Sequence, residues 1–166
     1  MIKHESKLEF CAKVMQWFEA NKRDLPFRKD KDPYRVWLSE ILLQQTQMGT
    51  GIKYYKKFIK KFPKIEKLAK AKEETIYSIW KGLGYYNRAK NLHKTAQEIV
   101  NNYQGVFPND YNDLLSLPGI GKYTASAISS ICFNSKRYVI DANVYRVLSR
   151  YLGINKKINQ SKSYKY

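Results

Sequence analysis

The residues that most constrain the fold are Leu117–Gly121, the sequence Leu-Pro-Gly-Ile-Gly. Proline cannot continue a helix and glycine can adopt positive φ, so this segment ends one helix and reverses the chain. A second helix is predicted from Lys122 to Cys132. Its first turn offers unpaired N–H groups beside Gly119 and Gly121, where no side chain obstructs an anion. The hairpin therefore indicates a phosphate site, although a single such turn more often only joins two helices.

Apolar residues recur every three or four positions along most of the chain, which is typical of amphipathic helices. Asp32 is predicted to cap a helix whose first residue is Pro33. Residues 106–108 and 137–140 are predicted to be short extended connections, and no segment alternates long enough for a strand. The predicted class is all-α, with helices at 5–22, 33–46, 50–61, 65–70, 73–80, 86–102 and 111–116, the hairpin helix, and a last helix after Asp141.

The charge balance favours a polyanionic partner. The 166 residues include 31 Lys and Arg against 14 Asp and Glu, a formal net charge of +17. Nucleic acid is the natural candidate, but a compositional bias can also load lysine onto a surface, so charge alone does not decide. The lysine clusters at 56–64 and 67–72 are interpreted as solvated helix faces. Without a membrane-spanning run or a signal-peptide core, we expect no membrane partner and a cytoplasmic, nucleoid-associated location.

The chain has only two cysteines, Cys11 and Cys132. Both lie in apolar helical patterns, so we expect reduced, buried thiols. They are too few for a four-cysteine metal site, and His4 and His93 are isolated. We therefore expect no cofactor to be held by residues of this chain.

Glu40 is the first candidate for acid–base chemistry. One helical turn away lie Val36 and Trp37 on one side and Leu43 and Gln44 on the other, a largely apolar setting. Desolvation there would raise the pKa of the carboxyl and suit it to be a general acid. The alternative, that Glu40 faces solvent or pairs with Arg35, is favoured by spacing alone.

Asp141 is the second candidate, and it immediately precedes an apolar helical pattern. We expect it to be a helix N-cap, and a cap carboxylate is kept ionised by backbone N–H groups and the helix dipole. A fixed anion can stabilise a developing cation. One acid biased toward its protonated form and one toward its ionised form make a plausible pair for cleaving a glycosidic bond.

Two segments carry planar side chains suited to a base stack. Gln44, Gln45, Thr46 and Gln47 are predicted to form an amide-rich end to the Glu40 helix. Gly82-Leu-Gly-Tyr-Tyr places two aromatics after a turn. Such groups can wedge between bases or fill the space of an extruded nucleotide, although a tyrosine more often packs in a core.

Together these residues resemble the helix-hairpin-helix base-excision DNA glycosylases, and within them the MutY-type adenine glycosylases. The resemblance implies an all-α fold with a six-helix lobe and a second helical lobe. Five motifs carry it, in family order along nearly the whole chain: Leu25-Pro-Phe-Arg, Asp32-Pro-Tyr-Arg-Val-Trp-Leu-Ser-Glu-Ile-Leu-Leu-Gln-Gln-Thr-Gln, Gly82-Leu-Gly-Tyr-Tyr-Asn-Arg-Ala-Lys-Asn-Leu-His, Leu117-Pro-Gly-Ile-Gly-Lys-Tyr-Thr-Ala and Ile140-Asp-Ala-Asn-Val-Tyr-Arg-Val-Leu-Ser-Arg.

The resemblance implies a monomeric enzyme that flips adenine out of a pair with 8-oxoguanine or guanine in duplex DNA and cuts its N-glycosidic bond. Glu40 matches the acid that protonates adenine, and Asp141 matches the carboxylate that stabilises the oxocarbenium-like sugar. The remaining matches are supporting positions near that cation (Tyr123, Asn143), a contact to the flipped base (Arg28), DNA contacts of the helix end and hairpin (Gln44, Thr46, Gly119, Gly121, Lys122), side chains inserted near the orphaned base (Gln45, Tyr85), and main-chain carbonyls of a hairpin cation site (Leu115, Leu117, Ile120).

Position 123 bears on the mechanism. Relatives that also cut the strand carry a lysine there as an amine nucleophile, and the tyrosine of this chain cannot form a Schiff base. Lys122 is adjacent, but the next residue on a helix points about 100° away. We therefore expect a monofunctional enzyme.

The chain also departs from the adenine-specific pattern. Asp141-Ala-Asn replaces the more usual Asp-Gly-Asn and, with Lys122-Tyr-Thr, is similar to a thymine or uracil mismatch group. That specificity is one alternative reading, and a DNA-binding module without catalysis is another.

The sequence ends at Tyr166, before the family's four iron–sulfur cysteines and 8-oxoguanine-recognition domain. The expected organisation is an N-terminal helix and loop at 1–27, a six-helix lobe at 28–138 that contains the hairpin, and the start of an incomplete second lobe at 139–166. An incomplete lobe would expose apolar surface.

Overall fold

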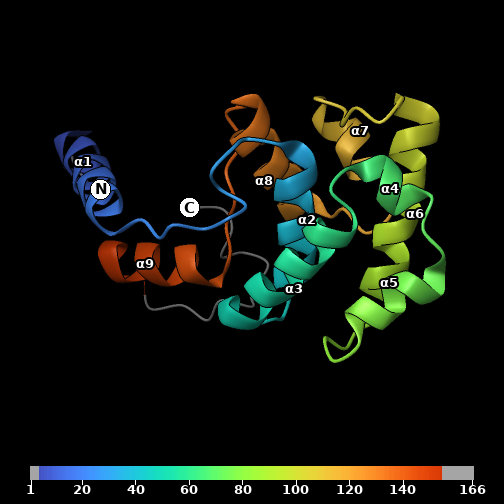
Figure 1. Cartoon of the computed structure of the whole chain (residues 1–166). Helices are drawn as coiled ribbons and strands as arrows, with labels where there is room; N and C mark the ends of the chain where they lie inside the picture. The colour runs from blue at the N-terminus through green and yellow to red at the C-terminus, as the bar shows by residue number, and fades with distance from the viewer. Residues whose placement is uncertain (1–3, 155–166) are drawn as a thin grey trace. The chain divides into compact units, whose positions relative to one another are not determined.

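A computed structural model describes residues 4–154, and it describes side chains from Lys7 onward. No strand occurs within this range, so the predicted all-α class is confirmed. The helices are α1 His4–Asn21, α2 Pro33–Leu43, α3 Met48–Lys61, α4 Ile65–Ala69, α5 Glu73–Trp80, α6 Asn87–Tyr103, α7 Tyr111–Ser116, α8 Lys122–Phe133 and α9 Ala142–Leu152 (Figure 1).

The chain divides into two compact units at the boundary between Asp30 and Lys31. The first unit contains α1 and the loop that follows it. Described side chains of α1 are exposed, with Phe10 half-buried. Cys11 is therefore exposed, and the prediction of a buried thiol is wrong there because the described residues of this unit leave the apolar stripe of the helix accessible. Cys132, in the second unit, is half-buried.

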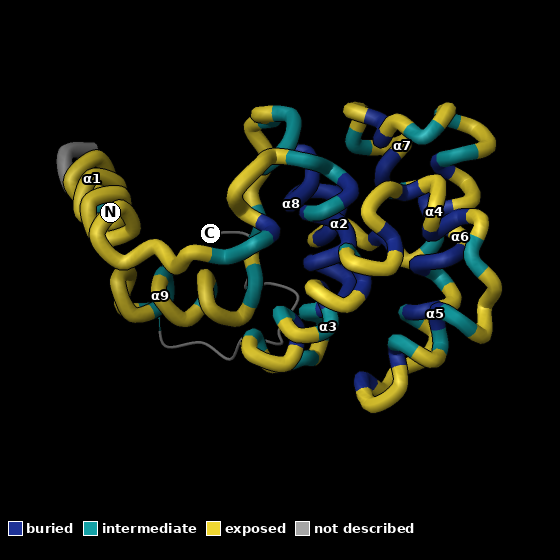
Figure 2. Tube along the Cα trace, viewed as in Figure 1, coloured by how far each residue is buried: buried dark blue, intermediate teal, exposed yellow. Residues whose placement is uncertain are grey.

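The core of the second unit is built around α2. Eight of its eleven residues are buried, and α2 packs against α3 and α8. Trp37, Leu38 and Leu42 are completely enclosed, and burying a side chain of this size contributes about 1.5–3 kcal/mol. The helix begins as predicted, because the carboxylate of Asp32 accepts a hydrogen bond from the N–H of Tyr34 at 2.8 Å. The buried part of the chain gathers on α2, α8, α4 and α6 (Figure 2).

The end of α2 differs from the prediction. The helix stops at Leu43 rather than near Thr46, because Gln44 leaves the helical region and Gln45 adopts a left-handed conformation with φ of +53°. The amide-rich segment is consequently a turn after the helix. The predicted bounds of the other helices lie within about two residues of those observed.

The basic residues and the last helix are largely exposed. Every lysine of the 56–64 and 67–72 clusters faces solvent, as predicted. No residue of α9 is buried, and its apolar side chains are accessible, among them Val147 and Tyr151. The final residues of the predicted 139–166 segment, 155–166, lie outside the described part of the chain. Within that described part, no helix has the length and apolarity needed to cross a bilayer.

Candidate functional site

The hairpin has the geometry that its sequence requires. Leu117 ends α7, and its carbonyl accepts a hydrogen bond from the N–H of Ile120 at 3.1 Å, which closes the turn. Gly119 has φ of +73°, a left-handed conformation that glycine adopts without strain. Gly121 does not use this freedom, because its φ is −89° in an extended backbone. Its role is therefore steric rather than conformational.

Residues of helix α6 contact the hairpin and restrict its position. The hydroxyl of Thr95, itself buried, donates a hydrogen bond to the carbonyl of Pro118 at 2.5 Å. A Cβ atom at Gly119 would lie 2.7 Å from the Cβ of Asn91 on the same helix, closer than real atoms approach. The turn is thus held in one position, which suits a site that binds through its backbone.

The N-terminus of α8 is open to a ligand. Gly121 is its N-cap, and no side chain caps the helix. A Cβ atom at Gly121 would meet nothing within 4 Å, and Gly121 and Lys122 are both exposed, so other residues do not crowd this end of the helix. Uncapped N–H groups at the positive end of a helix attract anions. Gly119, Gly121 and Lys122 lie together here, as the phosphate-site prediction requires.

The three carbonyls predicted to bind a cation belong to the same turn. Leu115 lies in the last turn of α7, Leu117 is the residue that ends this helix, and Ile120 precedes the N-cap of α8. The carbonyl of Leu117 already accepts one hydrogen bond, and a carbonyl oxygen has a second lone pair.

Glu40 is buried in the middle of α2, with 9% of its surface exposed. The solvent-facing alternative favoured by spacing is wrong, because α2 is enclosed on nearly all sides. Glu40 therefore lies inside the packed core of the second unit. Arg35 lies five residues earlier on α2, and its Nε is 3.6 Å from the carboxylate of Asp32. Its predicted pairing with Glu40 stays a prediction.

Asp141 is the N-cap of α9, as predicted. Its carboxylate accepts hydrogen bonds from the N–H groups of Val144 at 2.7 Å and Asn143 at 2.9 Å. Chiefly the Val144 bond, then Asn143 and the charge of Arg146, holds the pKa of Asp141 below its usual range, although partial burial opposes the shift. Asp141 is therefore an anion at neutral pH.

Asn143 and Arg146 extend this cap into a small network. The side-chain amide of Asn143 donates to the second oxygen of Asp141 at 3.0 Å, and Arg146 donates to the amide oxygen of Asn143. Arg146 was not identified from the sequence. Its position one turn after Asn143 on the predicted helix was the available signal.

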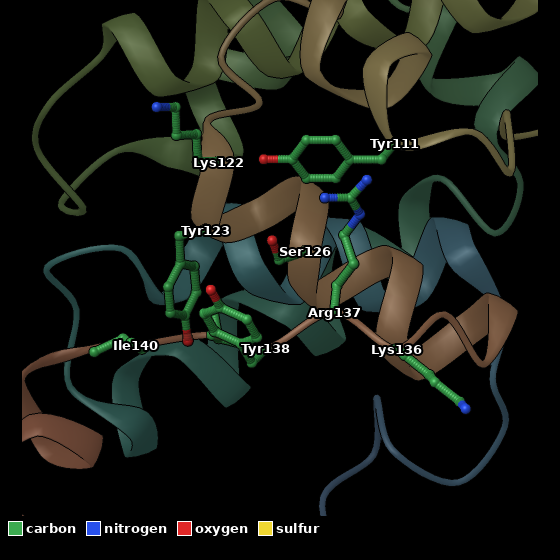
Figure 3. Close-up of a pocket in the computed structure, with 9 residues that line it drawn as sticks. Tyr111, Lys122, Tyr123, Ser126, Lys136, Arg137, Tyr138 and Ile140 are labelled. Carbon is green, nitrogen blue, oxygen red and sulfur yellow. The ribbon is translucent and has the colours of Figure 1, made fainter. Parts of the chain in front are cut away.

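Tyr123 borders a cavity of about 480 Å³ between the start of α8 and the segment that leads to α9. Ser126 lies at its centre, Tyr123 and Tyr138 lie on one side, and Tyr111 with Arg137 lies on the other (Figure 3). The guanidinium of Arg137 stacks 3.7 Å from the centroid of the Tyr111 ring. The cavity is thus lined by three tyrosines, three cationic side chains and the hydroxyl of Ser126.

Neither candidate carboxylate lines this cavity. Its lining ends at Ile140, one residue before Asp141, and Glu40 is absent from it. The structure therefore places Tyr123 near the segment that leads into α9, but Glu40 and Asp141 do not share this cavity.

The predicted wedge residues do lie together. Gln44, Gln45 and Tyr85 line a second cavity, of about 490 Å³. Tyr85 is 67% exposed, and Gln45 is also exposed. The hydroxyl of Thr46 donates to the carbonyl of Gln44 at 3.2 Å and braces this turn. Two segments about forty residues apart thus present an amide and a ring from one surface.

Arg28 belongs to the first unit. Its N–H donates to the carbonyl of Leu25 at 2.9 Å in a tight turn, and its side chain is exposed.

The residues present do not fit an iron–sulfur cluster. A four-iron cluster requires four thiolates, and the sequence contains two cysteines, in different units. Among the described side chains, no group of three or more His, Cys, Asp or Glu could hold a metal ion. No chemical step is assigned to such a group.

Comparison with known proteins defines the class. The model of the HhH-GPD superfamily of base excision DNA repair proteins matches residues 38–166, and the chain belongs to this superfamily. Among curated relatives, the adenine DNA glycosylase of Buchnera aphidicola subsp. Baizongia pistaciae is 46% identical over 89% of this chain and 42% of its own length. The human adenine DNA glycosylase is 41% identical over 85% of this chain and 28% of its own. The chain spans less than half the length of these relatives.

Solved structures agree on the fold. A thermostable thymine-DNA glycosylase matches with a TM-score of 0.85 and 33% identity over 95% of this chain and 75% of its own. A non-covalent endonuclease III–DNA complex matches with a TM-score of 0.77 at 23% identity, covering 97% and 73%, and this likeness concerns the fold alone. The predicted helix-hairpin-helix glycosylase fold is confirmed.

Proposed function

We propose that this chain binds duplex DNA as a monomer and removes adenine mispaired with 8-oxoguanine or guanine, without cutting the strand. The observation that carries the proposal is the 40–46% identity to curated relatives that are named adenine DNA glycosylases. The open, uncapped N-terminus of α8 beside Lys122 supports a phosphate contact. The carbonyls of Leu115, Leu117 and Ile120 are proposed to hold a cation beside that phosphate.

The two carboxyl groups have separate tasks in this proposal. Glu40, buried in α2, keeps its proton and transfers it to the adenine ring, so that the base leaves as a neutral molecule. Positive charge then develops on the sugar. Asp141, fixed as an anion by its cap bonds, stabilises that charge, and Asn143 holds the carboxylate in orientation. A water molecule then attacks the sugar cation and gives one proton to the Glu40 carboxylate, which restores the acid.

Tyr123 limits the reaction to base removal. A phenol has no amine to form an imine with the sugar, so the β-elimination that breaks a strand has no starting point. Tyr123 is instead proposed to lie beside the sugar cation. Gln45 and Tyr85 fill the space that the extruded adenine leaves, Gln44 and Thr46 contact the same strand region, and Arg28 contacts the flipped base.

A thymine or uracil mismatch glycosylase is the second candidate. The observation that favours it is the 33% identity and TM-score of 0.85 with a thermostable thymine-DNA glycosylase, together with the Asp141-Ala-Asn sequence.

A single-turnover assay distinguishes the candidates. The full chain is incubated with duplexes that hold A opposite 8-oxoguanine, A opposite G, T opposite G, or U opposite G, and each is then treated with alkali. We expect breaks after alkali for the first two duplexes only, and no break before it. Preferential cleavage of T or U would establish the second candidate. Binding without cleavage of any duplex would leave a non-catalytic DNA-binding module, and borohydride trapping of a covalent adduct would refute the role of Tyr123.

A further inference from the structure

The two wedge residues share an uncommon backbone conformation. Gln45 has φ of +53° and Tyr85 has φ of +47°, and only four non-glycine residues in the described part of the chain have positive φ. A left-handed conformation is unfavourable for a residue with a side chain, so each persists only where its surroundings enforce it. The exposed side chains of Gln45 and Tyr85 make little contribution to that enforcement.

One guanidinium contacts the end of α2 that carries Gln45 and the turn before α6 that carries Tyr85, which we call the two wedge segments. Arg88, in the first turn of α6, donates from Nη1 to the carbonyl of Ile41 at 3.1 Å and to the carbonyl of Gln44. From Nη2 it donates to the carbonyl of Leu83 at 3.2 Å. The end of α2 and the turn before α6 are therefore hydrogen-bonded to the same planar group. Such charge-assisted bonds are stronger than neutral ones.

Aromatic rings enclose the guanidinium. Its carbon lies 5.2 Å from the centroid of the Trp80 ring and 5.8 Å from that of Tyr85. Trp80 is completely buried, and its indole N–H donates to the carbonyl of Gly84 at 2.9 Å, which fixes the turn next to Tyr85. The backbone N–H of Arg88 in turn donates to the carbonyl of Tyr85 at 2.9 Å. A flexible ammonium could not make these bonds and stacks at once.

From these contacts we infer that Arg88 is a positioning residue that holds Gln45 and Tyr85 as one rigid pair, so that both enter the base stack together. The inference rests on the proposed function, because it assigns the pair to the extrusion of a base. A loose pair would have to be ordered when DNA binds, and that ordering would reduce the fraction of base extruded. In this inference Arg88 acts through the two segments, and it also lines the cavity that they form.

The first variant, Arg88→Met, keeps a long side chain but removes the charge and the planar N–H donors. The second, Arg88→Lys, keeps the charge but not the planar group. Lys90→Met is the matched control, because Lys90 is an exposed cation of the same helix. Melting temperatures identify any variant that has lost the fold, and Arg88→Lys serves if Arg88→Met does not fold. The first measurement is amide hydrogen exchange of the free protein.

In the free protein, we expect Arg88→Met to speed exchange at both wedge segments together. The N–H groups of Thr46 and Leu83 report on the two segments, since each closes a turn there. Exchange rates in α8 should not change. At the wedge segments, Arg88→Lys should exchange at a rate between those of the wild type and Arg88→Met, and Lys90→Met should exchange at the wild-type rate. Unchanged exchange at either segment would overturn the inference, whatever the enzymatic activity.

Base extrusion is measured by the fluorescence of a duplex with 2-aminopurine opposite guanine. We expect Arg88→Met to lower the extruded fraction roughly tenfold, the scale of losing about one net hydrogen bond. Tyr85→Asn, whose asparagine tolerates left-handed φ, should lower it in wild-type protein and far less in Arg88→Met. Equal penalties in both backgrounds would contradict action through Tyr85. A wild type that extrudes no base would refute the proposed function, while exchange would still decide whether Arg88 couples the segments.

Discussion

At the scale of single residues, the two candidate carboxyl groups differ because their surroundings differ. Glu40 lies inside α2, where eight of eleven residues are buried. Asp141 lies at a helix start, where two backbone N–H groups and an asparagine amide favour the charge. One helix interior and one helix terminus thus place the two candidate carboxyl groups in different surroundings.

Glu40→Gln tests the proton donor. The amide keeps the size and polarity of the side chain but has no acidic proton, so base release should fall at least about 10²–10⁴-fold, the usual contribution of a general acid. Single-turnover rates measure this loss, and gel-shift affinity for the same duplex should stay within about threefold. Normal turnover would exclude the assigned role.

Asp141→Asn separates charge from shape. Asparagine caps a helix as well as aspartate does, so α9 should remain intact by circular dichroism. The charge is lost, and base release should fall on the order of 10²–10³-fold, as for other electrostatic stabilisers. An unchanged rate would show that the carboxylate acts only as a cap.

The lowered pKa of Asp141 also predicts a pH dependence of stability. Between that lowered native value and the unfolded value of about 3.9, the native carboxylate is ionised while the unfolded one binds a proton. The stabilisation is complete above about pH 4 and is lost as pH falls through the native pKa. Acid unfolding of the wild type and Asp141→Asn should show this difference, and the asparagine variant should lack this component.

At the scale of elements, the hairpin contains two glycines with different functions. Gly119 is required by its positive φ and its approach to Asn91, whereas Gly121 adopts an ordinary conformation in open space. The first maintains the turn, and the second leaves the helix N-terminus accessible.

Alanine at Gly119 should therefore affect mainly stability, and alanine at Gly121 should affect mainly duplex binding. Gly119→Ala should destabilise the fold by about 1–2 kcal/mol or more, because left-handed φ and the close contact both penalise a Cβ. Gly121→Ala should cost about 1 kcal/mol or less but weaken duplex binding, because its methyl group occupies the path of a phosphate. Thermal melting and gel-shift titration measure the two effects. Equal melting temperatures with equal affinities would contradict both assignments.

The same elements show what could be predicted from sequence. The caps at Asp32 and Asp141 are local features, since acceptor and donors lie within three residues, and both predictions were correct. The end of α2 was placed too late because its carbonyls bond to Arg88, forty-four residues after Gln44. Spacing also could not show that Glu40 is buried, because that depends on which helices cover α2. Local chemistry was predictable, and long-range contacts were not.

At the scale of the whole molecule, the excess of basic residues covers exposed helix faces. The described lysines of α3 and its following loop all face solvent, and the formal net charge is +17. Such a surface attracts DNA without regard to sequence and releases counterions from it.

Duplex affinity should consequently fall steeply with salt. A chain that contacts about six phosphates loses about 10³-fold in affinity between 50 and 200 mM salt. Fluorescence anisotropy with a fully paired duplex measures the slope, and a mispaired duplex should give a parallel line displaced to tighter binding. A flat dependence for the paired duplex would show that the positive surface does not face DNA.

The cap at Asp141 has a consequence for how this position can change. Glutamate would keep the charge but is too long for the short reach to the N–H groups of Asn143 and Val144, and asparagine would keep those bonds but lose the charge. In the proposed function the helix cap and the stabilising charge depend on the same carboxylate, so glutamate and asparagine each lose one of these two properties. A saturation scan at this codon should sort its products into folded but inert proteins and poorly folded ones, with aspartate alone meeting both demands.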